Sequence, residues 1–177
     1  MHHKLVTKRL VLRELRVSDA PDLLAIATQA HILKFMPDWE MPLAQMEELL
    51  GWFESCYLHP ETTRIMLAIT LKESGEMIGV VGTGRKPEVN DDVEIMYYVS
   101  EAFQGKGYVS EAAKALADHA LECLDIDHLV AIAELDNPAS QKVLEKAGFR
   151  QQGLRQILNS GESEEKPFYY YRRDKRA

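Results

Sequence analysis

The stretch that decides the fold runs from Val93 to Glu111 and reads V-E-I-M-Y-Y-V-S-E-A-F-Q-G-K-G-Y-V-S-E. Its first seven residues alternate between two faces, with Ile95 and Tyr97 on one and Glu94 on the other, which predicts a strand. A glycine-bearing turn, Gln104 to Gly107, follows, and alanines and leucines then recur at helical spacing. Such a turn directs free backbone N–H groups and the positive end of a helix dipole at one point. The sequence therefore predicts an anion site here, most often for a phosphate or pyrophosphate.

This turn matches neither of the common nucleotide-binding patterns. A P-loop needs G-K-[ST] at a fixed distance after a first glycine, and Gly105-Lys106-Gly107 does not supply it. The dinucleotide pattern G-x-G-x-x-G needs a third glycine, where this chain has Ser110. A nucleotide-binding module is therefore disfavoured. A turn that needs glycine only for its backbone conformation stays open as a purely structural alternative.

Composition predicts an ordinary globular protein with an acidic balance. The 177 residues suit one domain, residues 1–177, and the 46% hydrophobic and 28% charged residues are typical of soluble proteins. The net charge of −7 argues against a general nucleic-acid binder, because phosphate contacts need clustered Lys and Arg. It suits a cationic partner such as an amine or a basic peptide.

The cysteines and the lengths of the apolar runs indicate in which cellular compartment the protein is expected. Cys56 and Cys123 form no C-x-x-C pair, so we expect free thiols in a reducing environment. No apolar run approaches the roughly 18 residues of a membrane span and no signal peptide opens the chain, so we expect a cytoplasmic protein with no membrane contact. The six histidines show no ligand spacing, and His2-His3 is too short for a tag or a metal site, so we expect no metal.

The order of predicted elements is β-α-α-β-β-β-α-β-α-β-β. This order predicts an α+β (mixed α/β) fold around one sheet, mostly antiparallel through hairpins and partly parallel through the strand–helix–strand in the middle. Helices are expected to begin near Ser18 and Pro42, and a loop is expected from Gly84 to Asp92. The remaining strands are expected at 5–14, 64–71, 77–83, 129–135, 149–158 and 167–173, and the later helices at 108–124 and 139–147.

Three motifs occur in a fixed order along nearly the whole chain. They are T-K-R-L-V-L-R at 7–13, Q-G-K-G-Y at 104–108 with Glu111-Ala112, and Asn137-x-x-Ser140 followed by E-K-A-G-F at 145–149. With these motifs the chain resembles the GNAT superfamily of acyl-CoA-dependent N-acetyltransferases, and specifically its RimJ/RimL-like branch of ribosomal-protein amino-terminal acetyltransferases.

The resemblance implies a GNAT-like fold that binds acetyl-CoA as a cosubstrate. The pyrophosphate of coenzyme A is then expected on the amides of 104–110, and its pantetheine arm in a splay between the strands at 93–99 and 129–135. The family also implies a bulge in the first of these strands, whose amide polarises the thioester carbonyl. The residues implied to bind the cofactor are Tyr97, Val99, Gln104, Gly105, Lys106, Gly107, Tyr108, Val109, Ser110, Asn137 and Ser140.

Two positions depart from the family pattern. Val109 stands where the turn usually ends in a small residue, so a β-branched side chain is expected to crowd it. Leu144 stands where many members have a tyrosine that protonates the departing thiolate. The RimJ/RimL-like branch has a serine one helical turn earlier, which matches Ser140, so Ser140 is the candidate for stabilising the thiolate. A first-turn serine with only a structural role is the alternative.

The implied reaction is direct transfer, in which a neutral primary amine attacks the thioester while both substrates are bound. Because such amines are mostly protonated at neutral pH, a base is needed, and Glu94 is the first candidate, with Glu134 and Tyr97 as others. A solvated glutamate without a catalytic role is the alternative reading of Glu94. Trp39 and Trp52 are expected to pack rather than to line an acceptor pocket.

The acceptor is left open by the sequence. A protein or peptide N-terminus is favoured over a polyamine, an amino sugar or another small amine. A non-catalytic acyl-CoA-binding regulatory module is the rival from another functional class. The resemblance is also compatible with a homodimer.

Overall fold

The computed structural model describes residues 3–59, 62–159 and 162–175. Over these residues the chain forms a mixed α/β fold with an eight-stranded sheet. The strands are β1 (Lys4–Val6), β2 (Leu10–Glu14), β3 (Ile65–Leu71), β4 (Met77–Lys86), β5 (Asp92–Val99), β6 (His128–Glu134), β7 (Arg150–Ile157) and β8 (Lys166–Asp174). The helices are α1 (Ala20–Ala27), α2 (Ala30–Leu33), α3 (Leu43–Cys56), α4 (Tyr108–Cys123) and α5 (Pro138–Lys146). Short 3-10 turns lie at η1 (Val17–Asp19), η2 (Pro37–Trp39), η3 (Pro87–Val89) and η4 (Glu101–Phe103).

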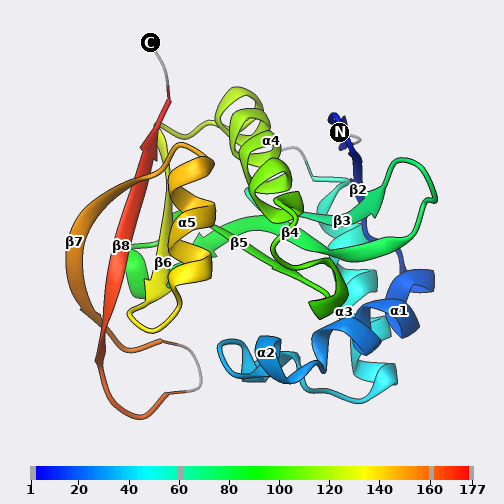
Figure 1. Cartoon of the computed structure of the whole chain (residues 1–177), viewed down its shortest axis with the longest axis horizontal. Coiled ribbons are helices and arrows are strands. Elements are labelled where there is room, and N and C mark those ends of the chain that lie inside the picture. Colours follow the sequence, from blue (N-terminus) through cyan, green and yellow to red (C-terminus); the bar gives the residue numbers. More distant parts are fainter. Residues whose placement is uncertain (1–2, 60–61, 160–161, 176–177) are drawn as a thin grey trace.

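The sheet is mostly antiparallel, as predicted. Its strand order is β1-β2-β3-β4-β5-β6-β8-β7, and within the described residues β5 and β6 form the one parallel pair (Figure 1). The helix α4 connects these two strands, which is the crossover that a parallel pair requires. The predicted α+β class and the predicted strand–helix–strand in the middle of the chain are therefore confirmed.

The strand β5 faces two cores, as its period of two predicts. Val93, Ile95 and Val99 belong to a core on the side of α4 and α5, whereas Tyr98 belongs to a core on the side of α1 and α3. Helices therefore cover both faces of the sheet, and none in the described ranges has the length and hydropathy that a bilayer crossing requires. Fully buried residues of the two cores include Leu116, Ala117 and Leu144 on the first side and Leu23, Met46 and Leu50 on the second.

Two of the predicted boundaries were wrong. The strand expected at 5–14 is a hairpin, β1–β2, closed where the Thr7 N–H donates to the Leu10 carbonyl over 3.0 Å. Side chains alternate between two faces on both sides of this turn, and the turn contains no glycine or proline that would have predicted it. The loop expected from Gly84 to Asp92 is shorter, because β4 continues to Lys86 and pairs with β5 down to Asp92. The short helix α2 was not predicted either.

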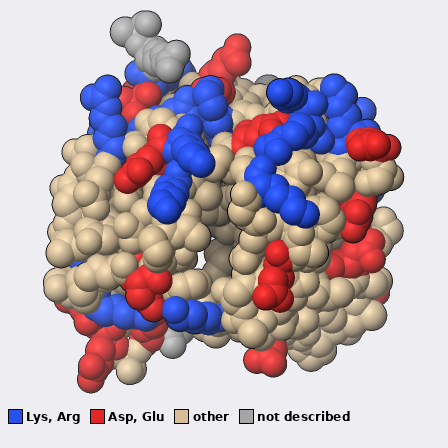
Figure 2. Space-filling view, viewed as in Figure 1, with Lys and Arg blue, Asp and Glu red and all other residues tan. Residues whose placement is uncertain are grey.

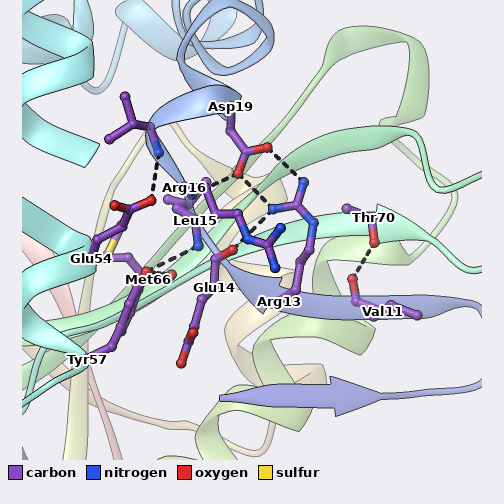
Figure 3. Close-up of polar contacts among 11 residues, drawn as sticks. Val11, Arg13, Glu14, Leu15, Arg16, Asp19, Glu54, Tyr57, Met66 and Thr70 are labelled. Carbon is purple, nitrogen blue, oxygen red and sulfur yellow. Dashed lines mark hydrogen bonds and ion pairs between the residues drawn. The ribbon is translucent and has the colours of Figure 1, made fainter. Parts of the chain in front are cut away.

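A buried carboxylate attaches the first helices to the sheet. Asp19 receives two bonds from the Arg13 guanidinium, at 2.7 and 2.8 Å, and one from the Arg16 N–H at 2.9 Å (Figure 3). Burial raises the pKa of Asp19, but these hydrogen bonds and the charge of Arg13 outweigh it, so the net shift is downward. Arg13, the last residue of the first sequence motif, therefore holds the start of α1 against β2.

The end of α3 is attached in a similar way. The Tyr57 hydroxyl donates to the Met66 carbonyl of β3 and accepts from the Leu15 N–H at 3.2 Å (Figure 3). Since these groups lie among buried residues, each hydrogen bond satisfies a backbone group that water cannot reach. The α1–α3 layer is thereby fixed in position beneath β3 and β4.

Candidate active site

The two central strands separate soon after they meet. Glu94 and Val130 form the single pairing between β5 and β6, although β5 continues to Val99 and β6 to Glu134. Beyond that pair the two strands diverge, so their facing edges carry backbone N–H and C=O groups that the sheet does not pair. The predicted splay between these strands is therefore present.

The bulge expected in β5 is not present. The pairing of β4 with β5 keeps one register from Gly79–Val99 to Lys86–Asp92. Alternate N–H groups of a strand point to opposite neighbours, so β5 still presents amides to the open side without a bulge. The backbone donors available beside the splay are therefore the N–H groups on the unpaired, regular edges of β5 and β6.

The surface is hollowed at this place. Figure 2 shows a hollow in the middle of one face, between the half that carries α5, β6 and β8 and the half that carries β4 and α2. Lys and Arg side chains flank the hollow toward α4, and Asp and Glu side chains lie on both sides of its lower part (Figure 2). The hollow is therefore flanked by cations toward the glycine turn and by side chains of both charges at its lower part (Figure 2).

The glycine turn presents its backbone to solvent. Gly105 and Gly107 have φ values of +71° and +79°, a left-handed conformation that residues with a Cβ rarely adopt. Gly107 is the N-cap residue of α4, and among the described residues no side chain caps this helix. The first N–H groups of a helix have no acceptor within it, so those of α4 face outward from an exposed turn.

A three-residue brace holds this turn in place. Glu111 accepts from the Thr7 hydroxyl at 2.6 Å, from the Arg9 N–H at 2.8 Å and from Arg9 Nε at 2.8 Å. Arg9 in turn donates to the Lys106 carbonyl at 2.8 Å and covers the Tyr108 ring at 4.4 Å. Burial raises the pKa of Glu111, but the hydrogen bonds outweigh it and the net shift is downward, so the carboxylate stays charged.

No role for Arg9 or Glu111 was predicted from the sequence. Both residues stand in the motifs that carried the family resemblance, Arg9 near the start of the chain and Glu111 just after the turn. The presence of both residues in these motifs was the one signal in the sequence that could have pointed to their role. Only the fold shows that residues 102 positions apart form one ion pair beneath the turn.

Several side chains of the turn are occupied within the protein. The Lys106 ammonium donates to the Ala102 carbonyl at 2.9 Å and lies over the Phe103 ring. Val109 packs against the α4-side core, so its branched side chain points away from the exposed turn. The crowding expected at Val109 is therefore not found, and Lys106 and Val109 offer a ligand chiefly their backbone amides.

A tyrosine of β5 contacts a serine of α5 beside the splay. The Tyr97 hydroxyl lies 2.9 Å from Ser140 Oγ and 3.2 Å from the Ser140 carbonyl. Burial raises the pKa of Tyr97, with the Ser140 hydrogen bond as a smaller opposing effect, so the phenol stays protonated at neutral pH. Leu144, in contrast, is 1% exposed and part of the core. A neutral hydroxyl pair therefore lies beside the splay, one helical turn before Leu144.

Asn137 holds the start of α5. Its side-chain oxygen accepts from the Ser140 N–H at 3.1 Å, which is the usual geometry of a helix N-cap. The cap orients Ser140 toward Tyr97. The structure thus gives Asn137 a positioning contact, and the coenzyme contact expected from the resemblance stays a prediction.

Glu94 lies at the point where β5 and β6 separate. Its side chain is 18% exposed, its carboxylate lies 3.6 Å from the Lys86 ammonium, and the Ile132 N–H of β6 donates to it. Burial raises the pKa of Glu94 to about 7, and the opposing effect of Lys86 is smaller. At neutral pH the group is therefore close to half ionised, which is the condition for taking and releasing a proton.

The other predicted residues are spread around this centre. Glu134 lies 3.5 Å from the Lys166 ammonium at the end of β6, and the Val99 carbonyl contacts the His31 ring at 2.9 Å. Trp39 packs against Tyr98 with ring centroids 5.1 Å apart, as expected. Trp52 is half exposed, and its other half packs, with its ring centroid 5.3 Å from that of Phe53 and the Arg64 guanidinium 5.5 Å above it. Gln104 is exposed in the turn, and Ser110 is half-buried in the first turn of α4.

Comparison with known families identifies the chain. Residues 9–150 match the family described as "Acetyltransferase (GNAT) domain". The chain belongs to the GNAT acetyltransferase family. It is an N-acetyltransferase of that family, and the predicted resemblance is confirmed.

The relatives of this GNAT protein support the predicted branch. It is 31% identical over 162 residues to an uncharacterized N-acetyltransferase, YjdG, of Bacillus subtilis, covering 88% of this chain and 92% of that one. It is 35% identical over 78 residues, 44% of each chain, to the ribosomal-protein-serine acetyltransferase of Escherichia coli. Its fold is also that of RimL, a ribosomal L7/L12 alpha-N-protein acetyltransferase solved with coenzyme A, at a TM-score of 0.80, 21% identity and coverage of 97% and 98%.

Proposed function

We propose that this single-domain GNAT enzyme, in the cytoplasm, transfers an acetyl group from acetyl-CoA directly to a primary amine, with both substrates bound together. One observation supports this most strongly. Glu94, with a pKa near neutrality, lies on the strand that borders the splay. Tyr97 lies on the opposite face of the same strand, where its hydroxyl contacts Ser140 of α5. A direct transfer needs a base on the side of the amine and a proton donor on the side of the leaving thiolate.

The residues around the hollow fit coenzyme A. The amides of 104–110 and the N-terminus of α4 suit its pyrophosphate, because they are exposed, uncapped and free of any Cβ at Gly105. The unpaired edges of β5 and β6 suit the amide groups of the pantetheine arm, which then adds hydrogen bonds where the sheet lacks them. The thioester would lie near the end of the splay, within reach of Tyr97 and Ser140.

Glu94 is the proposed general base. The attacking amine loses a proton as its C–N bond to the acetyl carbon forms, and a carboxylate with a pKa near 7 accepts it, directly or through one water molecule. The nearby Lys86 cation and the Ile132 N–H stabilise the ionised form that starts each cycle. Buried glutamates of this kind are commonly tuned upward for base chemistry.

The Tyr97–Ser140 pair is the proposed donor to the leaving sulfur. When the C–S bond breaks, the coenzyme A thiolate carries the charge, and a neutral hydroxyl can stabilise or protonate it. The two oxygens share a hydrogen bond of 2.9 Å, so either can donate while the other accepts. This pair would supply what Leu144 cannot.

For the acceptor, we propose a protein or peptide N-terminal amine. The acidic net charge of −7 and the Asp and Glu side chains beside the hollow favour a cationic approaching group (Figure 2). The names of two relatives also concern ribosomal proteins as substrates. A small amine is the second candidate. A non-catalytic acyl-CoA-binding module is the alternative that the departure at Leu144 leaves open.

Two linked measurements test the proposal. Thermal stabilisation of the protein is measured with acetyl-CoA and desulfo-CoA, with ATP and NAD as controls. Acetyl-CoA is then incubated with a panel of N-terminal peptides, polyamines and amino sugars while free thiol is followed. We expect stabilisation by the two coenzyme A compounds alone, and thiol release with the peptides.

The other outcomes are distinct. Stabilisation by both coenzyme A compounds without turnover on any amine would favour the binding module. Turnover only with polyamines or amino sugars would show that the proposed acceptor is wrong, and it would leave the proposed mechanism unchanged. No stabilisation by either coenzyme A compound would overturn the assignment of 104–110 as the pyrophosphate site.

A further inference from the structure

Three metal-ligating side chains meet at the end of α4 that is remote from the glycine turn. His119 and Cys123 lie one helical turn apart near the C-terminus of this helix, and His3 precedes β1. One nitrogen from each histidine and the cysteine sulfur all lie within 4.8 Å of one another. The reaction proposed above uses none of these residues.

The three atoms converge on one point. His119 Nε2 lies 2.9 Å from His3 Nδ1 and 3.6 Å from Cys123 Sγ, so it is the common neighbour of the other two. For zinc bonds of about 2.0–2.1 Å to nitrogen and 2.3 Å to sulfur, tetrahedral angles place N and S about 3.6 Å apart and two N atoms about 3.3 Å apart. The separation between His119 Nε2 and Cys123 Sγ already fits, and the N–N separation has to lengthen by about 0.4 Å. His3 Nδ1 and Cys123 Sγ lie within 4.8 Å of each other, and zinc would bring them to about 3.6 Å by a shift of the side chains.

The ligand side chains are already ordered in this arrangement. His3 is 6% exposed, and its backbone N–H donates to the Glu14 carboxylate at 2.7 Å. Its ring meets the His119 ring edge-on, with centroids 5.2 Å apart. Cys123 is a free thiol. A half-buried cluster of two imidazoles and one thiol is therefore present in the folded chain.

We propose that His3 Nδ1, His119 Nε2 and Cys123 Sγ bind one zinc ion, with water as the fourth ligand. Two imidazoles and a thiolate form a donor set that zinc prefers. The proton now between the two ring nitrogens moves to the outer nitrogen of the same imidazole, and the Cys123 thiol releases its proton to solvent. Binding therefore releases one proton and leaves both imidazoles neutral.

This site is structural. It connects residue 3, at the edge of the sheet, to residues 119 and 123, and so attaches the β1 hairpin to the far end of α4. Because the three ligands come together only in the folded chain, zinc that binds them stabilises the folded state. The zinc site does not depend on the acetyl transfer proposed above, and its test does not use activity.

The test uses the full chain, stripped of metal under reducing conditions and titrated with Co²⁺ as a spectroscopic substitute for Zn²⁺. We expect one equivalent to bind, with the intense visible bands of tetrahedral cobalt and a sulfur-to-cobalt charge-transfer band. Zn²⁺ should then displace the Co²⁺. Zinc should also raise the melting temperature, and a chelator should reverse this rise.

The variants identify the ligands. Cys123→Ser, His119→Asn and His3→Asn should each weaken Zn²⁺ binding at least about 100-fold, more than the loss of an outer-shell partner. The Cys123→Ser variant should also lose the sulfur band. The matched controls are Cys56→Ser, the other free cysteine, and His128→Asn, a histidine beside Asp92. Both should bind zinc like the wild type. Circular dichroism establishes that each variant is folded.

Two results would overturn the proposal. One is Co²⁺ binding without a sulfur band, or with equal affinity in Cys123→Ser, which would mean that the ion binds elsewhere. The other is no stoichiometric binding by the folded wild type. In that case the three side chains form only the hydrogen-bonded contact between β1 and α4.

Discussion

Burial sets the chemistry of the two ionisable side chains that β5 contributes to the site. It raises the pKa of Glu94 to about 7, and it raises the pKa of Tyr97 further above its ordinary value of 10. Burial therefore has different consequences for the two groups. The carboxyl group can exchange a proton at neutral pH, whereas the phenol stays protonated and can donate a hydrogen bond. Their placement three residues apart puts them on opposite faces of the strand.

The first prediction concerns the pH dependence of acetyl transfer. Since the ionised form of Glu94 is the base, kcat/KM should rise with pH through an apparent pKa of about 7. Glu94→Gln should lower kcat/KM by roughly 10²- to 10⁴-fold and remove this limb of the profile. Glu47→Gln, at an exposed position of α3, serves as the control. An unchanged limb in Glu94→Gln would assign the base to another group.

The second prediction concerns the stability of the same variant. Because the folded-state pKa of Glu94 is raised, the folded protein holds this proton more tightly than the unfolded chain between about pH 4.5 and 7. Stability from this group is therefore lost as pH rises through that window. Relative to wild type, Glu94→Gln should gain up to about 3 kcal/mol between pH 4.5 and 7.5. Urea unfolding of both proteins across pH measures the difference, and a pH-independent difference would contradict it.

The third prediction concerns the hydroxyl pair. Tyr97→Phe and Ser140→Ala should each lower kcat by roughly 10- to 100-fold with little change in acetyl-CoA binding, since they remove a donor to the leaving group. The double variant should lose little more than the worse single one, because the two groups act through one hydrogen bond. Fully additive losses would show that the two hydroxyls act separately.

At the scale of elements, the start of α4 depends on a motif from the other end of the chain. The Arg9–Glu111 pair lies directly beneath the glycine turn, and Thr7 completes the set of donors to Glu111. The turn itself needs left-handed residues at Gly105 and Gly107 to expose its amides. The β1–β2 hairpin therefore holds the glycine turn in position, whereas the turn itself supplies the backbone amides that would bind an anion.

The fourth prediction separates backbone strain from ligand binding. Gly107→Ala should lower stability by about 1–2 kcal/mol, because a Cβ disfavours its φ of +79°. It should also weaken desulfo-CoA binding at least about 10-fold, since the amides of the turn shift. Gly75→Ala is the matched control, with a φ of +76° in the distant β3–β4 turn. The Gly75→Ala variant should lose a similar amount of stability and bind desulfo-CoA like the wild type. Equal losses of affinity in both variants would argue against a pyrophosphate site on the turn.

For the whole molecule, the two halves of the sheet are joined by one strand pairing, by side-chain contacts and by a shared core. Residues of both halves pack in the core on the side of α4. Polar contacts between them include the Glu94–Val130 pair, Tyr97–Ser140, His128–Asp92 at 3.3 Å and the Lys34–Asp136 ion pair of 2.8 Å. Both members of that ion pair are more than half exposed, so it contributes little to the attachment of the halves. A ligand that lies in the splay would add contacts to both halves.

The fifth prediction follows from this arrangement. Saturating desulfo-CoA should slow hydrogen exchange at the ends of β5 and β6 beyond Glu94 and Val130, and at residues 104–110. Exchange in β7 and β8 serves as the internal control and should change little. At a ligand concentration of about 100 times Kd, the whole protein should gain roughly 2.7 kcal/mol. Protection confined to β7 and β8 would place the ligand elsewhere.

The sequence alone determined the elements that depend on local pattern. The alternation at 93–99, the glycine turn and the helical spacing after it were confirmed, because the period of side chains and the need for a positive φ are local properties. The order of strands and helices was enough to predict the mixed sheet with one parallel connection. The motifs were enough to predict the family.

The tertiary structure decided what depends on distant residues. The Arg9–Glu111 brace, the Tyr97–Ser140 pair and the meeting of His3 with His119 each join residues more than 40 positions apart. The periodicity of side chains within one helix or strand cannot predict a contact between such distant residues. The regular register of β5 in place of a bulge, and the raised pKa of Glu94, also required the fold. Register and burial are set by neighbouring strands and helices, and a pKa follows the burial that those neighbours create.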